Sequence, residues 1–539
     1  MTYRCRLHDD VVRTAPGAAT GVSAPSRRRV MLAGAALAAT MGWPIRADAQ
    51  TSAQGLLRIA NPFEFRTLKP SETGFTFLRV GATETLVAPD LDGRIVSLLA
   101  RSWSVSPDGL EWRLQLRTGI VFHDGSPMTP EAVKASFERL LPQSLYLKAA
   151  GIVAIETGAD EIVFRLSRPF GSFLDYLSDN STFVLAPAAF DSQGEVARII
   201  GTGPFRIVQA TLPRELTLAR HDRYWGRRAA FDSVQYSAVA NGETRANIAA
   251  TGDSDIVLNI PTPSIARVNA GGQVRIESAI IPRTHILMPN CAKPQFSDPR
   301  TRQALSLAID RAGIAASIMR NPALAATQYL APTLAAWRFP DIPPLRQDVA
   351  EARRLLDEAG WKVGPDGVRM KDGVRFAGTV RTFANRPELP VIAAACQSQF
   401  KAIGFDLKIS VGEFQAITQG QQDGTLELGL SSRNTVIVPD PISTIAIDFT
   451  SDVSPAGATG ATNWRNDGFR KDVASYLGAT EGAERASLRR RIVETLQSEL
   501  PVIPIVWYDQ IVAVNKRVEG FRVDPFEHQL RLEHLTMRS

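Results

Sequence analysis

Cysteine and histidine are scarce in this chain of 539 residues, which contains three and six of them respectively. Cys291 and Cys396 lack the CxxC spacing of a zinc or redox site, and the five histidines after residue 49 are not in metal-ligand spacing. We therefore expect no metal and no other cofactor. In an oxidising compartment the two cysteines form either a disulfide or two separate buried thiols. We expect them to be unpaired.

Sequence motifs of enzymes and nucleotide-binding proteins are also lacking. No GxxxxGK[ST], HExxH or GxSxG occurs, and the glycine-rich string GTGPFR at 201–206 carries Arg206 where a third glycine would be needed. The exception is an SxxK match from Ser398 to Lys401, but its partner motifs KTG and SDN are absent. The protein is therefore expected not to be an enzyme, with a serine–lysine hydrolase as a remote alternative.

Residues 1–49 resemble a twin-arginine export signal. Ser26–Leu32 reads SRRRVML, the apolar run Met31–Trp43 follows, and Ala47-Asp48-Ala49 supplies a small-x-small cleavage site. The apolar run is shorter than the roughly 20 residues that cross a bilayer, and no later run is long enough. We therefore expect a soluble periplasmic protein that begins near Gln50. No cysteine lies near the cleavage site, so no lipid anchor is expected.

Charge gives no indication of nucleic-acid binding once this segment is removed. The whole chain has 61 Lys+Arg and 55 Asp+Glu, of which residues 1–49 hold seven and three. The remaining 54 basic and 52 acidic residues give a net charge of +2, and no basic patch interleaved with aromatics appears. The length after residue 49 suggests about three units of ~150 residues.

The best-defined stretch is 84–141, which has the pattern of a strand followed by a capped helix. Side chains alternate between apolar and polar from Leu110 to Arg117, which predicts a strand with one buried face. Asp108-Gly109 and Asp124-Gly125 are turn dipeptides around it. Thr129 and Pro130 then mark a helix start with an inward stripe.

Helices and strands continue to alternate through the rest of the chain, which predicts an α/β fold. Asp298 and Pro299 begin a helix whose expected apolar stripe is Leu305, Ala308, Ile309 and Ala312. The further expected elements are a strand over Leu56–Ala60, a strand over Phe231–Val239, a helix over Val349–Ala359 capped by Asp348, a helix over Val391–Ile403, a strand over Phe405–Val411 and a helix over Glu484–Leu500.

Four strings stand out for their literal sequence: ETLVAPDLDGRIVSLLARSW to PEAVKASFERLL in 84–141, GTGPFR at 201–206, RHDRYWG at 220–226 and DPRTRQALSLAIDR at 298–311. In order and spacing they resemble the family-5 solute-binding proteins, the extracytoplasmic receptors of ABC importers for peptides, nickel chelates and related solutes. The resemblance covers nearly all of 56–539 and is weakest at the ligand-facing loops.

The resemblance implies an α/β, two-lobed periplasmic-binding-protein fold of type II, similar to the large cluster C, with a hinge and an interlobe ligand cleft. Lobe I is expected to comprise 50–280 and 503–539, with an extra subdomain near 84–200, and lobe II to comprise 281–502. Such a receptor is a monomer that closes on a small solute and delivers it unaltered to the transmembrane subunits of an ABC permease.

Ligand-binding residues are also implied by the resemblance. Phe65 and Thr67 lie in the loop after the first strand, and Arg386 matches an arginine that holds the substrate carboxylate in dipeptide-binding relatives, a task that a guanidinium fork suits. The remaining candidates are Arg433, Asn434, Asp440 and Trp464. For each of these candidate residues, the alternative is an ordinary structural or surface role.

One departure bears on the solute. Peptide-binding relatives commonly carry an aromatic residue and an aspartate shortly before the string PDP, whereas this chain has Arg433-Asn434 ahead of Pro439-Asp440-Pro441. A plain dipeptide is therefore less favoured than a more anionic solute, such as a modified peptide, an opine-like acid or a metal chelate. Bare nickel ion is disfavoured because no histidine lies near this loop.

Overall fold

The structure is a computed structural model that describes residues 55–538 except 385, 437 and 451–461. Its centre is a mixed β-sheet with the strand order β17-β16-β18-β12-β19-β11-β1-β10-β9-β8. The bounds in chain order are β1 Leu56–Asn61, β8 Phe205–Thr211, β9 Glu215–Arg220, β10 Ser233–Ala238, β11 Ile256–Leu258, β12 Val274–Pro289, β16 Ala377–Phe383, β17 Asp406–Gly412, β18 Leu428–Asn434 and β19 Ile503–Asn515. The predicted leader, 1–49, lies outside the described residues.

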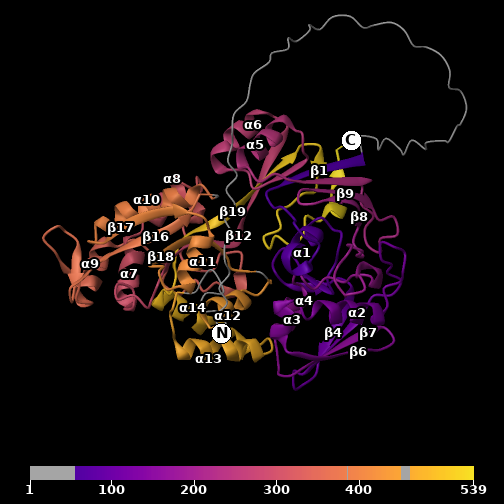
Figure 1. Cartoon of the computed structure of the whole chain (residues 1–539), viewed down its shortest axis with the longest axis horizontal. Helices are drawn as coiled ribbons and strands as arrows, with labels where there is room; N and C mark the ends of the chain where they lie inside the picture. The colour runs from indigo at the N-terminus through magenta and orange to yellow at the C-terminus, as the bar shows by residue number, and fades with distance from the viewer. Residues whose placement is uncertain (1–54, 385, 437, 451–461, 539) are drawn as a thin grey trace, which may run out of the picture. The chain divides into compact units, whose positions relative to one another are not determined.

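Two long antiparallel strands, β12 and β19, join the two sides of this sheet (Figure 1). On one side β12 pairs with β18, and β16 and β17 follow; we refer to these three strands as the β18 flank. On the other side β19 pairs with β11, and β1, β10, β9 and β8 follow as the β11 flank. β12 and β19 connect the two flanks, so the chain crosses from one flank to the other in two separate strands.

Smaller sheets lie outside this central sheet. The largest has the order β4-β5-β7-β6, and the others are hairpins or a three-stranded meander. Their strands are β2 Val87–Pro89, β3 Ile95–Ser97, β4 Ala100–Val105, β5 Glu111–Leu116, β6 Ile152–Thr157, β7 Glu161–Leu166, β13 Lys362–Val363, β14 Arg369–Lys371, β15 Val374–Arg375, β20 Val518–Glu519 and β21 Thr536–Met537.

Helices are short to moderate in length and alternate with the strands. They are α1 Pro70–Arg79, α2 Pro130–Leu140, α3 Leu145–Ala150, α4 Phe173–Leu177, α5 Gly242–Thr251, α6 Ile265–Ala270, α7 Pro299–Ala308, α8 Arg311–Ser317, α9 Val349–Glu358, α10 Glu388–Lys401, α11 Gln415–Gln422, α12 Ile442–Phe449, α13 Asp467–Gly478 and α14 Ala483–Glu499. Among the described residues, every helix is too short or too polar to cross a bilayer.

The predicted helix starts are confirmed in atomic detail. Thr129 Oγ1 accepts from Ala132 N at 3.2 Å, Asp298 from Arg300 N at 2.9 Å and Asp348 from Glu351 N at 2.9 Å. Each side chain therefore satisfies a backbone N–H that the first turn leaves without a partner. Gly360, with φ of 88°, follows the end of α9 as expected.

One helix boundary was predicted wrongly. Leu305, Ala308 and Ile309 are fully buried, but Ala312 is exposed. The reason is that α7 ends at Ala308 and a second helix, capped by Asp310, begins at Arg311. The new axis changes which face points inward, so the periodicity does not continue across the break.

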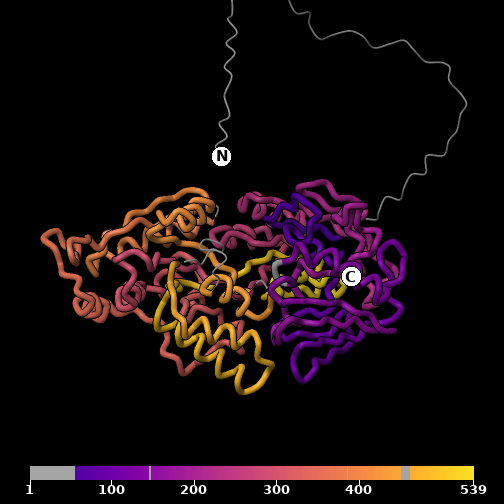
Figure 2. Tube along the Cα trace, turned by 60° about the horizontal axis from the view of Figure 1, so that its bottom comes forward, coloured from indigo at the N-terminus to yellow at the C-terminus, as the bar shows by residue number. Residues whose placement is uncertain are grey.

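Buried apolar side chains form three main clusters that follow the flanks. One lies within 286–507 and adds Phe526, one joins 57–258 to 512–535, and one lies within 86–186 and adds Val438. Figure 2 shows the yellow C-terminal segment among the indigo and magenta ones, as the pairing of β19 with β11 requires. Cys291 and Cys396 are both free, as predicted.

Leu428 offers a test of this packing. It is fully buried on β18, between β16 and β12. We expect Leu428→Ala to lower the free energy of unfolding by about 2–5 kcal/mol, because it leaves a cavity in a central strand. Urea denaturation followed by circular dichroism measures this. Val391→Ala on α10, where the side chain is 51% exposed, is the control and should change stability by less than about 0.5 kcal/mol.

Asp179 predicts a pH dependence of stability. The residue is 1% exposed, and burial outweighs the hydrogen bonds from Ser181 and raises the pKa of its carboxyl to about 6. The unfolded value is about 3.9, so the native state keeps a proton that the unfolded state loses between pH 4 and 6. The contribution of Asp179 to the free energy of unfolding therefore falls as pH rises through this window.

The variant Asp179→Asn removes this titration while keeping an oxygen that accepts from Ser181 N. Its stability relative to the unmodified protein should rise between pH 4 and 6, by at most about 3 kcal/mol, and stay level above pH 6. Urea denaturation at a series of pH values provides the comparison. Parallel curves for the two proteins would contradict the assignment.

Candidate functional site

The strand order places a candidate site where β12 and β19 pass from one flank to the other. β16 and β18 are parallel and end at Phe383 and Asn434, and Asn434 lies opposite Arg283 of β12. On the other flank, β1 and β11 are parallel and end beside Val512 of β19. Ligands of open α/β sheets bind outside the carboxyl ends of strands where the strand order changes, and both sets of ends meet here.

A β-bulge in β12 shapes this region. Ile281 lies opposite Tyr508 of β19 and Thr284 lies opposite Trp507, so Pro282 and Arg283 are extra residues in the pairing with β19. Thr435 N and Oγ1 both donate to Pro282 O, at 2.8 and 2.9 Å, and hold the bulge. Bulges re-aim side chains, and this one directs Arg283 toward the ring of Tyr508.

Tyr508 is the centre of a charged cluster. The guanidinium carbons of Arg283 and Arg386 lie 5.6 and 5.1 Å from its ring centroid, distances at which cations interact with an aromatic face. The ring of His285 lies 5.5 Å from the same ring. Tyr508 itself is half-buried. We refer to the set Arg79, Arg283, His285, Arg386, Glu388, Tyr508 and Glu527 as the Tyr508 cluster.

Glu527 neutralises part of this positive charge. Its carboxylate lies 3.0 Å from Arg283 Nη2 and 3.5 Å from Arg79 Nη2. Burial alone would raise the pKa of Glu527, but the two arginines outweigh it and lower the pKa, which keeps the carboxylate ionised. Arg79 also lies over the rings of Phe63 and Phe75, at 5.9 and 5.7 Å.

His285 and Glu388 complete the cluster on the β18 flank. His285 Nε2 lies 3.3 Å from Glu388 Oε1, and Arg386 Nη1 lies 3.9 Å from the same oxygen. Burial lowers the pKa of His285 despite the nearby Glu388 carboxylate, so the ring is neutral at neutral pH. Three arginines therefore face two glutamates, and the cluster carries one excess positive charge.

Of the residues predicted to bind the ligand, Arg386 and Asn434 are at this place. Arg386 follows β16 and contacts Tyr508. Asn434 ends β18 opposite Arg283, and its Oδ1 accepts from Val436 N at 3.1 Å. Arg433, the next residue, forms two hydrogen bonds of 2.8 Å with the buried Asp448 and is held against α12.

The loop after β1 contributes differently from the prediction. Phe65 is fully buried and packs edge-on against Phe77 and Tyr236, because its side chain points into the core beneath the loop. The aromatic side chain of this loop that contacts the Tyr508 cluster is Phe63. Thr67 is half-buried, and its Oγ1 donates to Glu72 at 3.1 Å in the turn before α1.

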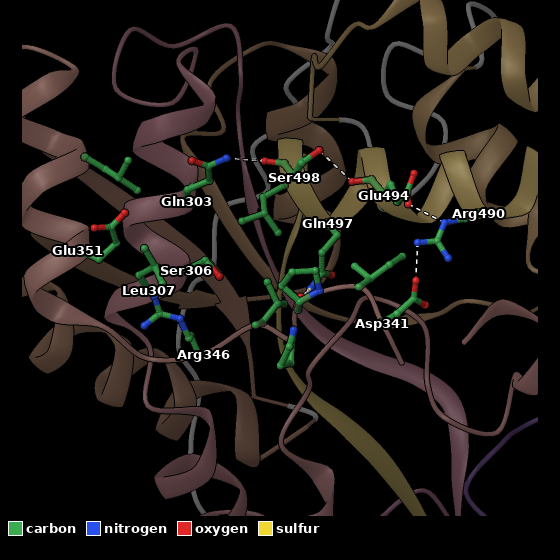
Figure 3. Close-up of a pocket in the computed structure, with 16 residues that line it drawn as sticks. Gln303, Ser306, Leu307, Asp341, Arg346, Glu351, Arg490, Glu494, Gln497 and Ser498 are labelled. Carbon is green, nitrogen blue, oxygen red and sulfur yellow. Dashed lines mark hydrogen bonds and ion pairs between the residues drawn. The ribbon is translucent and has the colours of Figure 1, made fainter. Parts of the chain in front are cut away.

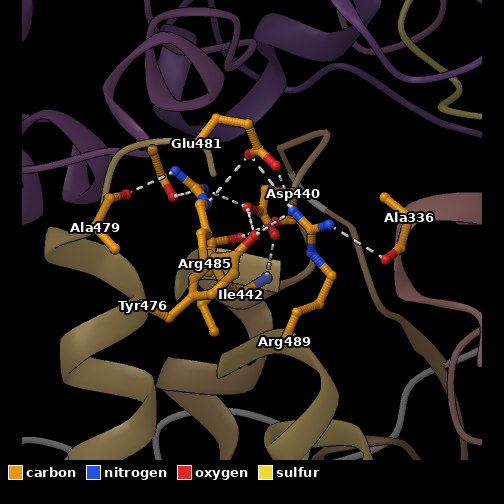
Figure 4. Close-up of polar contacts among 10 residues, drawn as sticks. Ala336, Asp440, Ile442, Tyr476, Ala479, Glu481, Arg485 and Arg489 are labelled. Atoms are coloured by element: carbon orange, nitrogen blue, oxygen red, sulfur yellow. Dashed lines mark hydrogen bonds and ion pairs between the residues drawn. The ribbon is translucent and has the colours of Figure 1, made fainter. Parts of the chain in front are cut away.

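Trp464 and Asp440 also have structural partners. Trp464 is 9% exposed, packs against Phe449 and Phe469, and donates from Nε1 to Glu499 at 3.2 Å. Asp440 accepts from Tyr476 and Arg485, both at 2.8 Å, within a network that Figure 4 shows. Among the described residues, no interaction links Trp464 or Asp440 to the Tyr508 cluster.

The Asp440 network joins segments that are far apart in the sequence. Arg485 Nη2 donates to Ser172 Oγ at 2.8 Å as well as to Asp440, and Gly171 N donates to Leu477 O at 2.8 Å. A Cβ on Gly171 would lie 1.9 Å from Ala479 O, so glycine is required for this approach. The network therefore fixes α13 and α14 against the segment before α4.

A separate cavity of about 540 Å³ lies between α7, α9 and α14 (Figure 3). Its polar groups bind one another: Arg490 pairs with Asp341 and Glu494, and Gln303 donates to Ser498 O. All of its lining residues fall within 303–500, so it does not lie at the crossing of β12 and β19. We do not assign the solute to it.

Sequence reasoning missed most of the Tyr508 cluster. Arg283 carried a usable signal, since it stands with Thr284 and His285 between the apolar strings Ile280–Pro282 and Ile286–Met288. Glu388 stands two residues after the predicted Arg386. Glu527 and Arg79 are more than four hundred positions apart and gave no local signal. The structure adds no support for the serine–lysine hydrolase alternative, because Ser398 and Lys401 are both exposed on α10.

Comparison with known proteins decides the family. The sequence model of the bacterial extracellular solute-binding proteins, family 5, matches residues 94–454. The chain belongs to this family. It is thus the solute-binding component of an ABC importer and works with permease subunits, as the sequence predicted.

Relatives of this solute-binding protein match almost its whole length. The glutathione-binding protein GsiB of Salmonella paratyphi A is 26% identical over 482 residues, which cover 86% of this chain and 90% of that protein. NikA of Brucella suis, in complex with Fe(III)-EDTA, has a TM-score of 0.79 at 23% identity, with 90% and 100% covered. A nickel ABC transporter protein of Bacillus halodurans has a TM-score of 0.75 at 26% identity, with 89% and 99% covered. The predicted two-lobed α/β fold is confirmed.

The Asp440 network of this solute-binding protein predicts strong coupling between its charges. Asp440→Asn or Arg485→Gln alone should each lower the free energy of unfolding by about 3–5 kcal/mol, because each leaves a buried partner unpaired. The double variant should cost less than the sum by about 1–3 kcal/mol. Urea denaturation measures all three variants.

Arg491→Gln on the same helix provides the control, since Arg491 forms an ion pair with Asp472 while 47% exposed. Its effect should be far smaller than that of Arg485→Gln. Additive effects of Asp440→Asn and Arg485→Gln would show that the network is not a coupled unit.

Proposed function

We propose that this protein binds a small peptide-like solute through a carboxylate at Arg386 and delivers it to the permease without altering it. The observation that carries the proposal is the state of Arg386 at the meeting point of the two flanks. Its side chain is 23% exposed, one face lies on Tyr508, and its sole ion-pair partner in the described part of the chain is Glu388 at 3.9 Å. A guanidinium so placed has donors left for a carboxylate.

Glu388 supports a peptide-like solute. Peptide binding requires an acid that meets the ligand's amino group, and position 433–434 does not supply one. Glu388 lies beside Arg386, is 17% exposed in its side chain, and has Oε1 without a hydrogen-bond partner among the described residues. Arg386 and Glu388 together match the two ends of a zwitterion.

The lobes of this proposal are those that the sequence predicted: lobe I of 50–280 and 503–539, and lobe II of 281–502. The three buried clusters and the crossing strands β12 and β19 support these boundaries, and the bulge at Pro282 suits a hinge. Residues 1–49 act as a twin-arginine leader, and the mature protein is a monomer in the periplasm without a lipid anchor.

A metal chelate is the second candidate solute. The excess positive charge of the Tyr508 cluster suits an anionic chelate, and the structurally similar NikA of Brucella suis is in complex with Fe(III)-EDTA. Elemental analysis of protein purified from its own periplasm, with mass spectrometry of the released solute, separates the candidates. A stoichiometric metal would favour the chelate.

The variant Arg386→Ala should raise the Kd for the released solute by about ten-fold or more, equivalent to about 1.4 kcal/mol, because it removes the carboxylate partner. Isothermal titration calorimetry with that solute measures this. Arg353→Ala on the exposed side of α9 is the matched control and should leave Kd unchanged. Equal affinities of Arg386→Ala and the unmodified protein would remove Arg386 from the site.

A further inference from the structure

Arg283 is a buried guanidinium whose hydrogen bonds are incomplete. It is 8% exposed, and Nη2 donates to Glu527 at 3.0 Å. Its Nε and Nη1 are buried and have no hydrogen-bond partner in the part of the chain that the structure describes. An unsatisfied donor on a buried charged group costs about 1–3 kcal/mol or more, so these two donors need an acceptor from outside the described chain.

Other buried arginines of the protein show that this is not general. Arg311, 5% exposed, donates to Pro504 O, Ser306 O and Ser306 Oγ at 2.7–2.8 Å. Arg245 donates from each nitrogen to the carbonyl oxygens of the loops around it, at 2.7–3.0 Å. In these two arginines, carbonyl and hydroxyl oxygens of the protein satisfy every guanidinium nitrogen.

Positive charge also exceeds negative charge around Arg283. Arg386 lies on the same tyrosine ring, and Arg79 shares Glu527 with Arg283 and has its own Nη1 without a hydrogen-bond partner among the described residues. Glu527 balances one of these two arginines. One guanidinium charge beyond that of Arg386 therefore remains unmatched beside Tyr508.

We infer that Arg283 forms a second anion subsite next to Arg386, so that the solute carries two acidic groups and one amine. The inference rests on the proposed solute site at Arg386 and Glu388. The groups of the cluster that a solute can engage are the guanidinium of Arg386, the two free donors of Arg283 and the carboxylate of Glu388, which His285 and Arg386 approach at 3.3 and 3.9 Å. They are complementary to two carboxylates and one ammonium. Such a solute has a net charge of −1, equal and opposite to the excess charge of the cluster.

Geometry sets the kind of contact that Arg283 offers. Glu527 occupies Nη2, which shares an edge of the guanidinium with Nε, whereas Nη1 lies on the other side. The free Nε and Nη1 therefore each offer a single charge-assisted hydrogen bond rather than a two-pronged one. Pro282 O is held by Thr435, so the backbone of the bulge is fixed when the side chain binds.

The test compares two dipeptides that differ by one charge, alanyl-glutamate and alanyl-glutamine, by isothermal titration calorimetry. We expect the unmodified protein to bind alanyl-glutamate about ten-fold more tightly or better. Arg283→Gln should reduce this preference to about two-fold or less while retaining affinity for alanyl-glutamine. Arg283→Lys keeps the charge toward Glu527 but lacks the free Nε and Nη1 donors, so it tests the same loss in a variant that retains the ion pair.

Arg275→Lys, on the same strand, serves as the control and should leave the preference unchanged, since Arg275 pairs with Glu277 and Val518 O. Thermal unfolding of each variant establishes that it is folded. Arg386→Ala should weaken both dipeptides equally, which separates the two proposals. Loss of affinity in Arg386→Ala with an unaltered preference in both Arg283 variants would overturn the second subsite alone.

The second subsite would also be overturned if the unmodified protein bound alanyl-glutamate and alanyl-glutamine equally well. Buried water would then be the partner of the two free donors of Arg283. Binding of neither dipeptide would overturn the peptide-like solute and the inference with it. A second measurement is independent of the probes: the solute released from the purified protein is esterified with methanol, and mass spectrometry counts its acidic groups. We expect at least two, and a count of one contradicts the inference.

Discussion

The structure depends on the continuous pairing of β12 with β19. These two strands are the only elements of the central sheet, as far as it is described, that take part in both flanks. Hydrogen bonds of a ladder tolerate little stretching, so the two flanks are held at a fixed spacing where the strands cross. Two irregularities, between Ile281 and Thr284 and between His285 and Ile286, allow a local change of direction without loss of the ladder on either side.

The charged side chains at the crossing of β12 and β19 are stabilised by the groups around them. Glu527 stays ionised in a buried position because two arginines outweigh its loss of hydration. Arg283 and Arg386 share an aromatic face, which favours cations but supplies no hydrogen bonds. Two donors of Arg283 are left without a partner in the described part of the chain, which agrees with the anion site that we propose.

Sequence reasoning succeeded where the signal is local. Caps at Thr129, Asp298 and Asp348 and the strand around Trp112 depend on residues a few positions apart, so the pattern predicts them directly. The site is different, because Arg79, Arg283, Arg386 and Glu527 meet only after the sheet has formed. Arg386 was found by resemblance. Phe65 was named for its place in the loop after the first strand, and that place does not tell which of Phe63 and Phe65 points into the core.

One short segment links the bulge of β12 to two other parts of the protein. Thr435 anchors the bulge that carries Arg283, Val438 packs in the apolar cluster of 86–186, and Asp440 receives Arg485, which also holds Ser172. A ligand shifts a conformational equilibrium only through its different affinities for the two states. In the proposed site, a solute that satisfies Arg283 and Arg386 together favours the arrangement in which the bulge, this segment and the Asp440 network are all in place. Both arginines lie in the predicted lobe II and contact the predicted lobe I, Arg283 through Glu527 and Arg386 through Tyr508. A solute bound to both arginines therefore acts on two contacts between the predicted lobes, whereas a solute bound to Arg386 alone acts on one.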